Sequence, residues 1–128
     1  MRYFDLLGKR FRYGGRGPEH YDCYGLVMEL YRRRGIELPE YESFADPQLI
    51  DAGLSDGRER WVTGIDQPEP GCMVMFRVHP PYVSHIGVML DSLRFIHIMR
   101  KTSVAVERID SLLWRDKLAG FYRYYPHG

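Results

Sequence analysis

Cys23, His85 and His97 are the residues of this sequence whose types could together carry out acyl transfer. A cysteine thiolate attacks amide carbonyls, a histidine can take the thiol proton, and a polar group on the second ring nitrogen can orient that histidine. Cys23 stands where a helix is expected to begin, directly after Asp22. Because unpaired N–H groups and the helix dipole stabilise an anion there, we expect a lowered pKa for Cys23.

Each of these residues, taken alone, also fits a purely structural role. Cys23 lies on the apolar stripe of the expected helix, and a single histidine on an apolar strand is usually a packed residue. His20 and His79 stand in turns and Cys72 begins an expected strand, so these three are assigned no chemical role. The two cysteines follow no pattern and no secretory signal precedes them, so we expect two free thiols. No Cys-x-x-Cys pair occurs, so we expect no metal site.

One helix is expected to carry Cys23. Apolar residues recur at helical spacing from Cys23 to Arg34, and Asp22 is suited to cap the N-terminus because its side chain can accept from an unpaired backbone N–H. Three arginines fill the last turn, where the helix dipole favours cations. Gly35 stands where a left-handed C-cap belongs, so the helix is expected to end there.

The middle of the chain, residues 40–70, is acidic and rich in turn residues. A short helix is expected over residues 46–56, because Asp46 can cap it and Pro47 fits its first position. Neither side of this segment could hold a full core alone. We therefore predict a single domain over residues 1–128.

Short β-branched or aromatic runs separated by Pro, Ser or Asp turns follow Gly71 and predict antiparallel strands. An N-terminal helical region followed by such strands is typical of an α+β fold. The expected strands are Cys72–Val78, His85–Leu90, Arg94–Met99, Val104–Ile109 and Gly120–Tyr125.

The hairpin between the two histidine strands must bring His85 and His97 to one face of the sheet if both serve one site. In an antiparallel pair, the numbers of two directly paired residues always add to the same register sum. Side chains on the two strands share a face only when their own numbers add to an even total for an even register sum, or to an odd total for an odd one. A two-residue turn would put these histidines on opposite faces. We therefore predict a three-residue loop, Asp91-Ser92-Leu93, or a bulge that restores the parity.

The composition excludes several classes of protein. The chain has 128 residues, a formal net charge of +1 and ordinary shares of apolar and charged residues, so collagen-like and mainly disordered chains are excluded. A nucleic-acid binder usually has a large basic excess, and we expect no nucleic-acid partner. The longest apolar run, residues 72–76, is too short to span a membrane. The N-terminus lacks the pattern of a secretory signal, which predicts a cytoplasmic location as synthesised.

Four groups of residues follow one another along most of the chain, over about residues 6–125. They are Phe11-Arg12-Tyr13-Gly14-Gly15, then Asp22-Cys23-Tyr24-Gly25-Leu26-Val27, then Pro70-Gly71-Cys72-Met73-Val74-Met75-Phe76, and last Ser84-His85-Ile86-Gly87-Val88 with Phe95-Ile96-His97. In this order and spacing they resemble the NlpC-type cell-wall cysteine peptidases. The variant Asp-Cys-Tyr-Gly-Leu-Val is similar to the peptidase-like domain of phage tail-tip assembly proteins.

The resemblance implies a papain-like fold, with N-terminal helices packed on a five- to six-stranded antiparallel sheet. It implies a triad of Cys23 as nucleophile, His85 as base and His97 as the polar third member. The implied reaction is cleavage of peptidoglycan stem peptides, typically at the γ-D-glutamyl–diaminopimelyl bond, without a cofactor. The tail-tip variant implies phage tail proteins as partners and a virion tail acting at the cell wall as the location.

The sequence departs from the family pattern at three positions. Phe11 stands where the family has a tyrosine whose hydroxyl points toward the thiol and its oxyanion, so either the enzyme is slow or Tyr13 or Tyr24 supplies that donor. Tyr24 itself replaces the usual serine, and Cys72 replaces an aspartate. Two other readings stay open: a tail or assembly protein that hydrolyses little, and a cysteine amidohydrolase of another acyl substrate. The candidate substrate-binding residues are Asp22, Tyr24, Ser84, Phe11 and Tyr13.

Overall fold

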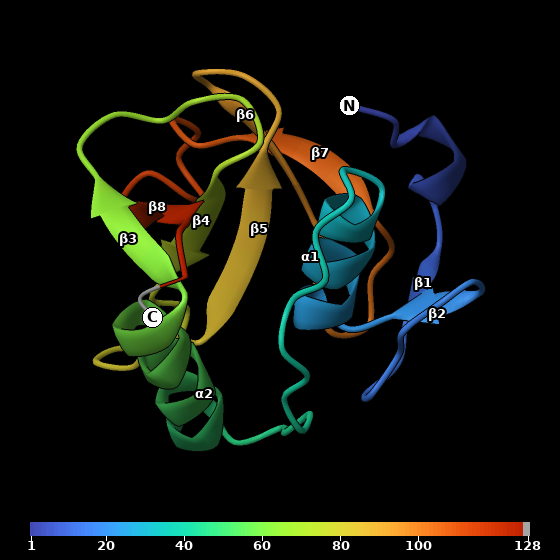
Figure 1. The fold of residues 1–128 in the computed structure, drawn as a ribbon, viewed down its shortest axis with the longest axis horizontal. Helices are drawn as coiled ribbons and strands as arrows, with labels where there is room; N and C mark the ends of the chain where they lie inside the picture. Colours follow the sequence, from blue (N-terminus) through green and yellow to red (C-terminus); the bar gives the residue numbers. More distant parts are fainter. Residues whose placement is uncertain (127–128) are drawn as a thin grey trace.

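The structure is a computed structural model and describes residues 1–126. Both α-helices come before the strands of the antiparallel sheet, as the sequence predicts, and a short strand pair comes before the helices (Figure 1). The helices are a 3₁₀ turn η1 (Phe4–Leu6), α1 (Cys23–Arg32) and α2 (Pro47–Arg60). The strands are β1 (Arg10–Phe11), β2 (His20–Tyr21), β3 (Val62–Ile65), β4 (Met73–Phe76), β5 (His85–Met89), β6 (Arg94–His97), β7 (Ala105–Arg108) and β8 (Leu118–Tyr124).

The main sheet of the described residues has six strands in the order β3-β8-β4-β5-β6-β7, and every neighbouring pair is antiparallel. The predicted α+β fold with a five- to six-stranded sheet is therefore confirmed. Strands β1 and β2 form a separate parallel pair near the N-terminus of α1. Strand β3 was not predicted, because its four residues include Gly64 and form a strand only by pairing with β8.

Both faces of the sheet are covered, and this explains why β4 and β5 are buried along their whole lengths. On one face, Met73, Met75 and Ile86 join the main core, which includes the apolar stripe of α1. On the other face lies a smaller cluster in which a tryptophan from the segment before β8 covers the sheet. The residues of this second cluster are Cys72, Val74, Phe76, Met89, Phe95 and Trp114.

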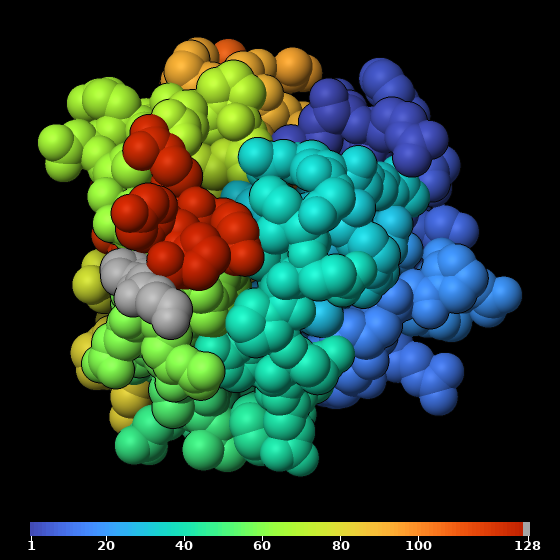
Figure 2. Space-filling view, viewed as in Figure 1, coloured from blue at the N-terminus to red at the C-terminus, as the bar shows by residue number. Residues whose placement is uncertain are grey.

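Helix α1 begins as its sequence predicts. Asp22 has an extended backbone, and its side chain accepts a hydrogen bond from the N–H of Gly25 at 2.6 Å. The helix ends at Arg32, two residues earlier than expected, and Gly35 adopts the left-handed conformation with φ of +81°. The residues after α1 can therefore turn back over the molecule, where the α1–α2 connection covers much of the face seen in Figure 2.

Helix α2 begins at the predicted position and runs one turn longer than predicted. Asp46 accepts from the N–H of Gln48 at 2.9 Å, and Pro47 occupies the first helical position. The extension to Arg60 brings Gly57 against the ring of Trp61, where an added Cβ would lie 3.0 Å from the nearest ring atom. No helix among residues 1–126 combines the length and the apolar character that crossing a membrane requires.

Candidate active site

Cys23 is the first residue of α1 and lies half-buried in the wall of a cavity of about 830 Å³. The cavity lies between the loop after β1, helix α2 and the beginning of β5. Every predicted site residue except His97 lines it, so the fold brings side chains of residues 11–24 and of residues 84–85 to one place. These residues are Phe11, Tyr13, Asp22, Cys23, Tyr24, Ser84 and His85.

The hairpin of β5 and β6 confirms the predicted parity. The register pairs Val88 with Ile96, and the N–H of Leu90 donates to the carbonyl oxygen of Arg94 at 2.8 Å, so the loop between this last pair has the three residues 91–93. His85 and His97 consequently share one face of the sheet, and both are buried. Nε2 of His85 lies 2.8 Å from Nδ1 of His97, which is a hydrogen bond between the two rings.

The expected lowering of the Cys23 pKa is wrong. Burial raises the pKa of the thiol to about 12, and the charge of Asp22 adds to the rise. Hydrogen bonds with the backbone of Ile86 and Tyr24 offset only part of it. The thiol is therefore protonated at neutral pH, because the helix terminus does not outweigh the loss of solvent. Attack on a carbonyl then needs a base beside it.

His85 is suited to be that base because it is uncharged at neutral pH. Burial lowers its pKa well below the usual value, and the neighbouring His97 lowers it further. A neutral imidazole carries one lone pair on the ring and can accept a proton there. The buried neutral pair, thiol and imidazole, is the resting state that this environment favours.

Glu107 is a residue of this site that the sequence reasoning missed. Its carboxylate on β7 is hydrogen-bonded to Nε2 of His97. Strands β6 and β7 pair His97 with Ala105, so Glu107 is diagonal to His97 on the same face. Once the register of β7 is known, the alternation of side chains along a strand places Glu107 and His97 on one face.

Trp114 is a second missed residue, and it covers the histidine pair. Its ring stacks on His85 with a centroid distance of 5.5 Å, and meets the ring of His97 edge-on at 5.0 Å. It is 3% exposed. A single tryptophan in a turn-rich segment has no periodic pattern, so no signal in the sequence points to this contact.

The free energy of unfolding is expected to fall as the pH is lowered from about 7 to about 5, because both histidines are buried uncharged. Burial lowers the pKa of His97, although Glu107 opposes this shift. In the unfolded chain the histidines take up protons at pH ~6.5, whereas in the folded state they stay neutral at that pH. The stability that comes from keeping them neutral is therefore complete above that pH and is lost below it. Urea unfolding at several pH values measures the slope.

The variant His97→Gln should show a shallower dependence on pH over this range, because one of the buried groups is gone. His79→Gln is the matched control, since His79 is exposed and its replacement separates the loss of a buried histidine from the loss of any histidine. Equal slopes for wild type and His97→Gln would contradict the expectation.

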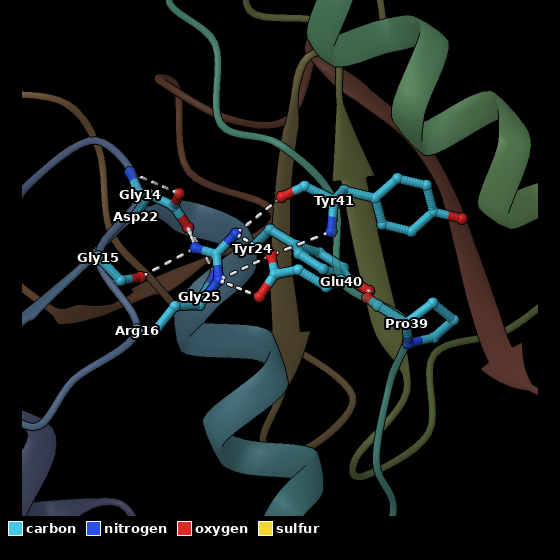
Figure 3. Close-up of polar contacts among 9 residues, drawn as sticks. All are labelled: Gly14, Gly15, Arg16, Asp22, Tyr24, Gly25, Pro39, Glu40 and Tyr41. Atoms are coloured by element: carbon cyan, nitrogen blue, oxygen red, sulfur yellow. Dashed lines mark hydrogen bonds and ion pairs between the residues drawn. The ribbon is translucent and has the colours of Figure 1, made fainter.

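Asp22 lines the cavity and also accepts hydrogen bonds from three neighbouring residues (Figure 3). It is 4% exposed, and Oδ1 accepts from Gly25 N and from Nη1 of Arg16, at 2.6 and 2.7 Å. Oδ2 accepts from the N–H of Gly14 at 3.1 Å. The carboxylate thus joins the first turn of α1 to residues 12–17, here called the glycine loop, which form part of the cavity wall.

Arg16 extends this network to the segment after α1 (Figure 3). Its guanidinium donates to the carboxylate of Glu40, with Nε 3.0 Å from Oε1, and to the carbonyl oxygen of Tyr41 at 2.9 Å. It also donates to the carbonyl oxygen of Gly15 at 3.0 Å. Arg16 was not predicted as a site residue, because two of its partners, Glu40 and Tyr41, are 24 and 25 residues away in the chain.

Tyr13 and Tyr24, which line the cavity with Phe11, differ in whether their hydroxyl groups are free to donate a hydrogen bond there. The hydroxyl of Tyr24 donates to the carbonyl oxygen of Pro39 at 2.5 Å, so Tyr24 does not supply the donor that Phe11 lacks. The ring of Tyr13 meets Phe11 edge-on at 5.1 Å, and its hydroxyl accepts from Arg100 at 3.4 Å. Tyr13 is therefore the tyrosine whose hydroxyl proton is available in this part of the cavity.

Both cysteines are free thiols, as predicted. Within residues 1–126, no three side chains of His, Cys, Asp or Glu gather closely enough to hold a metal ion. What the arrangement can do chemically is acyl transfer, because a thiol and a neutral imidazole line one cavity.

A family model described as the NlpC/P60 family matches residues 8–123. The chain belongs to the NlpC/P60 family. Over 117 residues this NlpC/P60 domain is 27% identical to the murein DD-endopeptidase MepS/murein LD-carboxypeptidase of Escherichia coli K12. It is also 27% identical over 119 residues to the probable endopeptidase p60 of Listeria innocua. Both alignments cover 91% of this chain, but only 56% and 22% of those proteins, so the chain spans about half or less of their lengths.

Solved structures show the same fold. An NlpC/P60 family protein from Bacillus cereus superposes with a TM-score of 0.71 at 21% identity, covering 94% of this chain and 37% of that chain. A lipoprotein-like NLP/P60 family protein from Staphylococcus aureus superposes with a TM-score of 0.67 at 24% identity, covering 96% of this chain and 38% of that chain. The NlpC/P60 domain of this chain therefore has the α+β architecture of its family.

Proposed function

We propose that this NlpC/P60 domain is a cysteine endopeptidase that hydrolyses an amide bond in peptidoglycan stem peptides. The γ-D-glutamyl–diaminopimelyl bond is the proposed target. The observation that carries the proposal is that Cys23 and His85 line one cavity while His97 holds the other nitrogen of His85 at 2.8 Å. The E. coli relative is named as a murein endopeptidase, which supports the substrate class.

In the proposed reaction, His85 takes the proton of the Cys23 thiol as the sulfur attacks the carbonyl carbon of the substrate. The resulting oxyanion lies at the N-terminus of α1, where the backbone N–H of Cys23 and the helix dipole stabilise it. The intermediate expels the amine, which takes the proton from His85. Water, deprotonated by the same imidazole, then hydrolyses the thioester and restores the thiol.

A tail or assembly protein that keeps the fold but hydrolyses little is the second candidate. The observation in its favour is Phe11, which presents a ring without a hydroxyl to the cavity. This second function would place the chain in a virion tail, with other tail proteins as partners. A third, a cysteine amidohydrolase of another acyl substrate, would use the same Cys23 and His85.

The proposal is tested by digesting purified peptidoglycan and identifying the products by mass spectrometry. Wild type and Cys72→Ala should release the same new fragments, because Cys72 is buried in the second cluster away from the cavity. Cys23→Ala should release none. Fragments also released by Cys23→Ala would overturn the assignment of the nucleophile. If wild type releases no fragments but a thiol-reactive acyl probe labels Cys23, the result would favour the amidohydrolase. If wild type releases no fragments and the probe does not label Cys23, the result would favour the tail protein.

The variant Phe11→Tyr is expected to raise kcat on a stem-peptide substrate at least several-fold. A well-placed oxyanion donor contributes on the order of 3 kcal/mol, or roughly 100-fold in rate, and Phe11 has the ring without the donor. Tyr24→Phe is the matched control, because the Tyr24 hydroxyl is bonded to Pro39 and should not affect kcat through an oxyanion. An unchanged kcat in Phe11→Tyr, together with a reduced kcat in Tyr13→Phe, would show that Tyr13 already supplies the donor.

A further inference from the structure

We infer that Glu107 is a positioning residue that sets the protonation pattern of both buried histidines and thereby leaves Nδ1 of His85 as the nitrogen that can accept a proton. The effect on rate rests on the proposed function. The protonation pattern itself does not, because it follows from the contacts of three side chains from three neighbouring strands, β5, β6 and β7.

The contacts form a single line that begins at the surface and ends at the cavity. The carboxylate of Glu107, whose side chain is 36% exposed, is hydrogen-bonded to Nε2 of His97. Nδ1 of His97 lies 2.8 Å from Nε2 of His85. His85 is 3% exposed and lines the cavity together with Cys23.

The direction of each hydrogen bond follows from what each group can do. A carboxylate only accepts hydrogen bonds, so His97 must carry its proton on Nε2 and donate it to Glu107. A neutral imidazole has one N–H, so Nδ1 of His97 can only accept, and His85 must donate to it from Nε2. Nδ1 of His85 then holds the lone pair of that ring.

Burial makes this pattern the only favourable one for the neutral pair. Because burial lowers the pKa of both histidines, neither ring takes up a second proton. A ring with its proton on the wrong nitrogen therefore cannot make both of its hydrogen bonds. Trp114 covers both rings, so water cannot replace a lost partner at low cost. Without Glu107, His97 could place its proton on Nδ1, and His85 would then have to donate from Nδ1 and accept at Nε2. That form of His85 cannot take the thiol proton.

The carboxylate also acts when His85 becomes charged. During the proposed attack the imidazolium of His85 would donate to His97, and the negative charge of Glu107 lies at the end of the same line of hydrogen bonds. Glu107 touches neither the substrate nor the sulfur of Cys23, so it acts only through His97. Its effect should therefore appear in kcat rather than in KM.

The first test reads the protonation pattern directly by nitrogen-15 NMR of the histidine side chains in the wild-type protein. We expect Nε2 of both His85 and His97 to be the protonated nitrogens, and Nδ1 of both to be unprotonated. In Glu107→Leu, which removes the acceptor, His97 should lose this preference. A wild-type spectrum with Nδ1 protonated on either ring would overturn the inference, whether or not the leucine variant folds.

The second test is kinetic. Glu107→Leu should lower kcat on stem peptides at least about tenfold with KM changed by less than about twofold. Glu107→Gln keeps an acceptor oxygen without the charge and should fall between wild type and Glu107→Leu. Asp110→Asn is the matched control, because Asp110 is an exposed carboxylate beyond the end of β7 that pairs with Arg108. A kcat in Glu107→Leu equal to that of Asp110→Asn would overturn the positioning role.

The two tests separate this inference from the proposed function. If the expected protonation pattern is found but wild type releases no peptidoglycan fragments, Glu107 positions the histidines of a protein with a different activity. If fragments are released but the pattern is absent, the endopeptidase stands and the role of Glu107 fails.

Discussion

Replacing Asp22 with alanine is expected to lower the free energy of unfolding by about 3 kcal/mol, from a lost helix cap and a broken, largely buried ion pair. The variant leaves the N–H groups of Gly25 and Gly14 without their acceptor. It also removes a carboxylate partner of Arg16, whose side chain is only 24% exposed. At this chain length the loss should lower the melting temperature by about 10 °C, measured by circular dichroism.

Asp46→Ala is the control for Asp22→Ala, because Asp46 caps α2 in the same way. Its side chain accepts only the bond from Gln48 among the hydrogen bonds of the described residues, and that bond is exposed. A cap of this kind contributes about 1 kcal/mol. If the two variants lose equal stability, the contacts of Asp22 with the glycine loop and Arg16 contribute nothing, and the network in Figure 3 is not a support of the site.

Trp114→Ala is expected to lower the free energy of unfolding by about 4 kcal/mol, because it empties the space of a large buried ring. The ring contacts His85, His97 and Phe76, so its loss also lets water reach the histidine pair. Chemical denaturation measures the stability. Nitrogen-15 spectra of the histidines should show increased exchange of their ring protons with water.

Trp114→Phe should lower the free energy of unfolding much less than Trp114→Ala does. Comparison with Trp61 tests whether the unpaired indole N–H of Trp114 is the reason. The indole N–H of Trp114 is buried and has no hydrogen-bond partner within residues 1–126, so phenylalanine keeps most of the ring and removes an unpaired donor. The indole N–H of Trp61 donates to the hydroxyl of Tyr41 at 2.9 Å. Trp61→Phe should therefore cost about 1 kcal/mol more than Trp114→Phe. The reverse order would contradict this account of the two indoles.

The elements that carry the chemistry were predictable from short stretches of sequence. The cap of α1 depends on Asp22 and the next three residues, and the left-handed position of Gly35 depends on that glycine alone. The common face of His85 and His97 follows from the number of residues between them. These features are local, so their physical causes lie within a few residues or in a simple count.

The partners of those elements were not predictable in the same way. Glu107 reaches His97 only because β6 and β7 pair in one register, and Trp114 reaches both histidines only because its segment folds over that face. The partners of Arg16 come from a connection that no periodic pattern describes. Each of these contacts depends on which long-range packing has the lowest free energy.

The protonation state of Cys23 shows the same division most clearly. The sequence by itself determined that the thiol begins a helix, and that placement alone lowers a thiol pKa. Only the tertiary structure decided how much solvent the sulfur loses and how the carboxylate of Asp22 acts on it, and these two effects raise the pKa of Cys23 to about 12. Burial outweighs the helix terminus because desolvation acts on the whole charge of a thiolate, whereas the dipole contributes a partial charge.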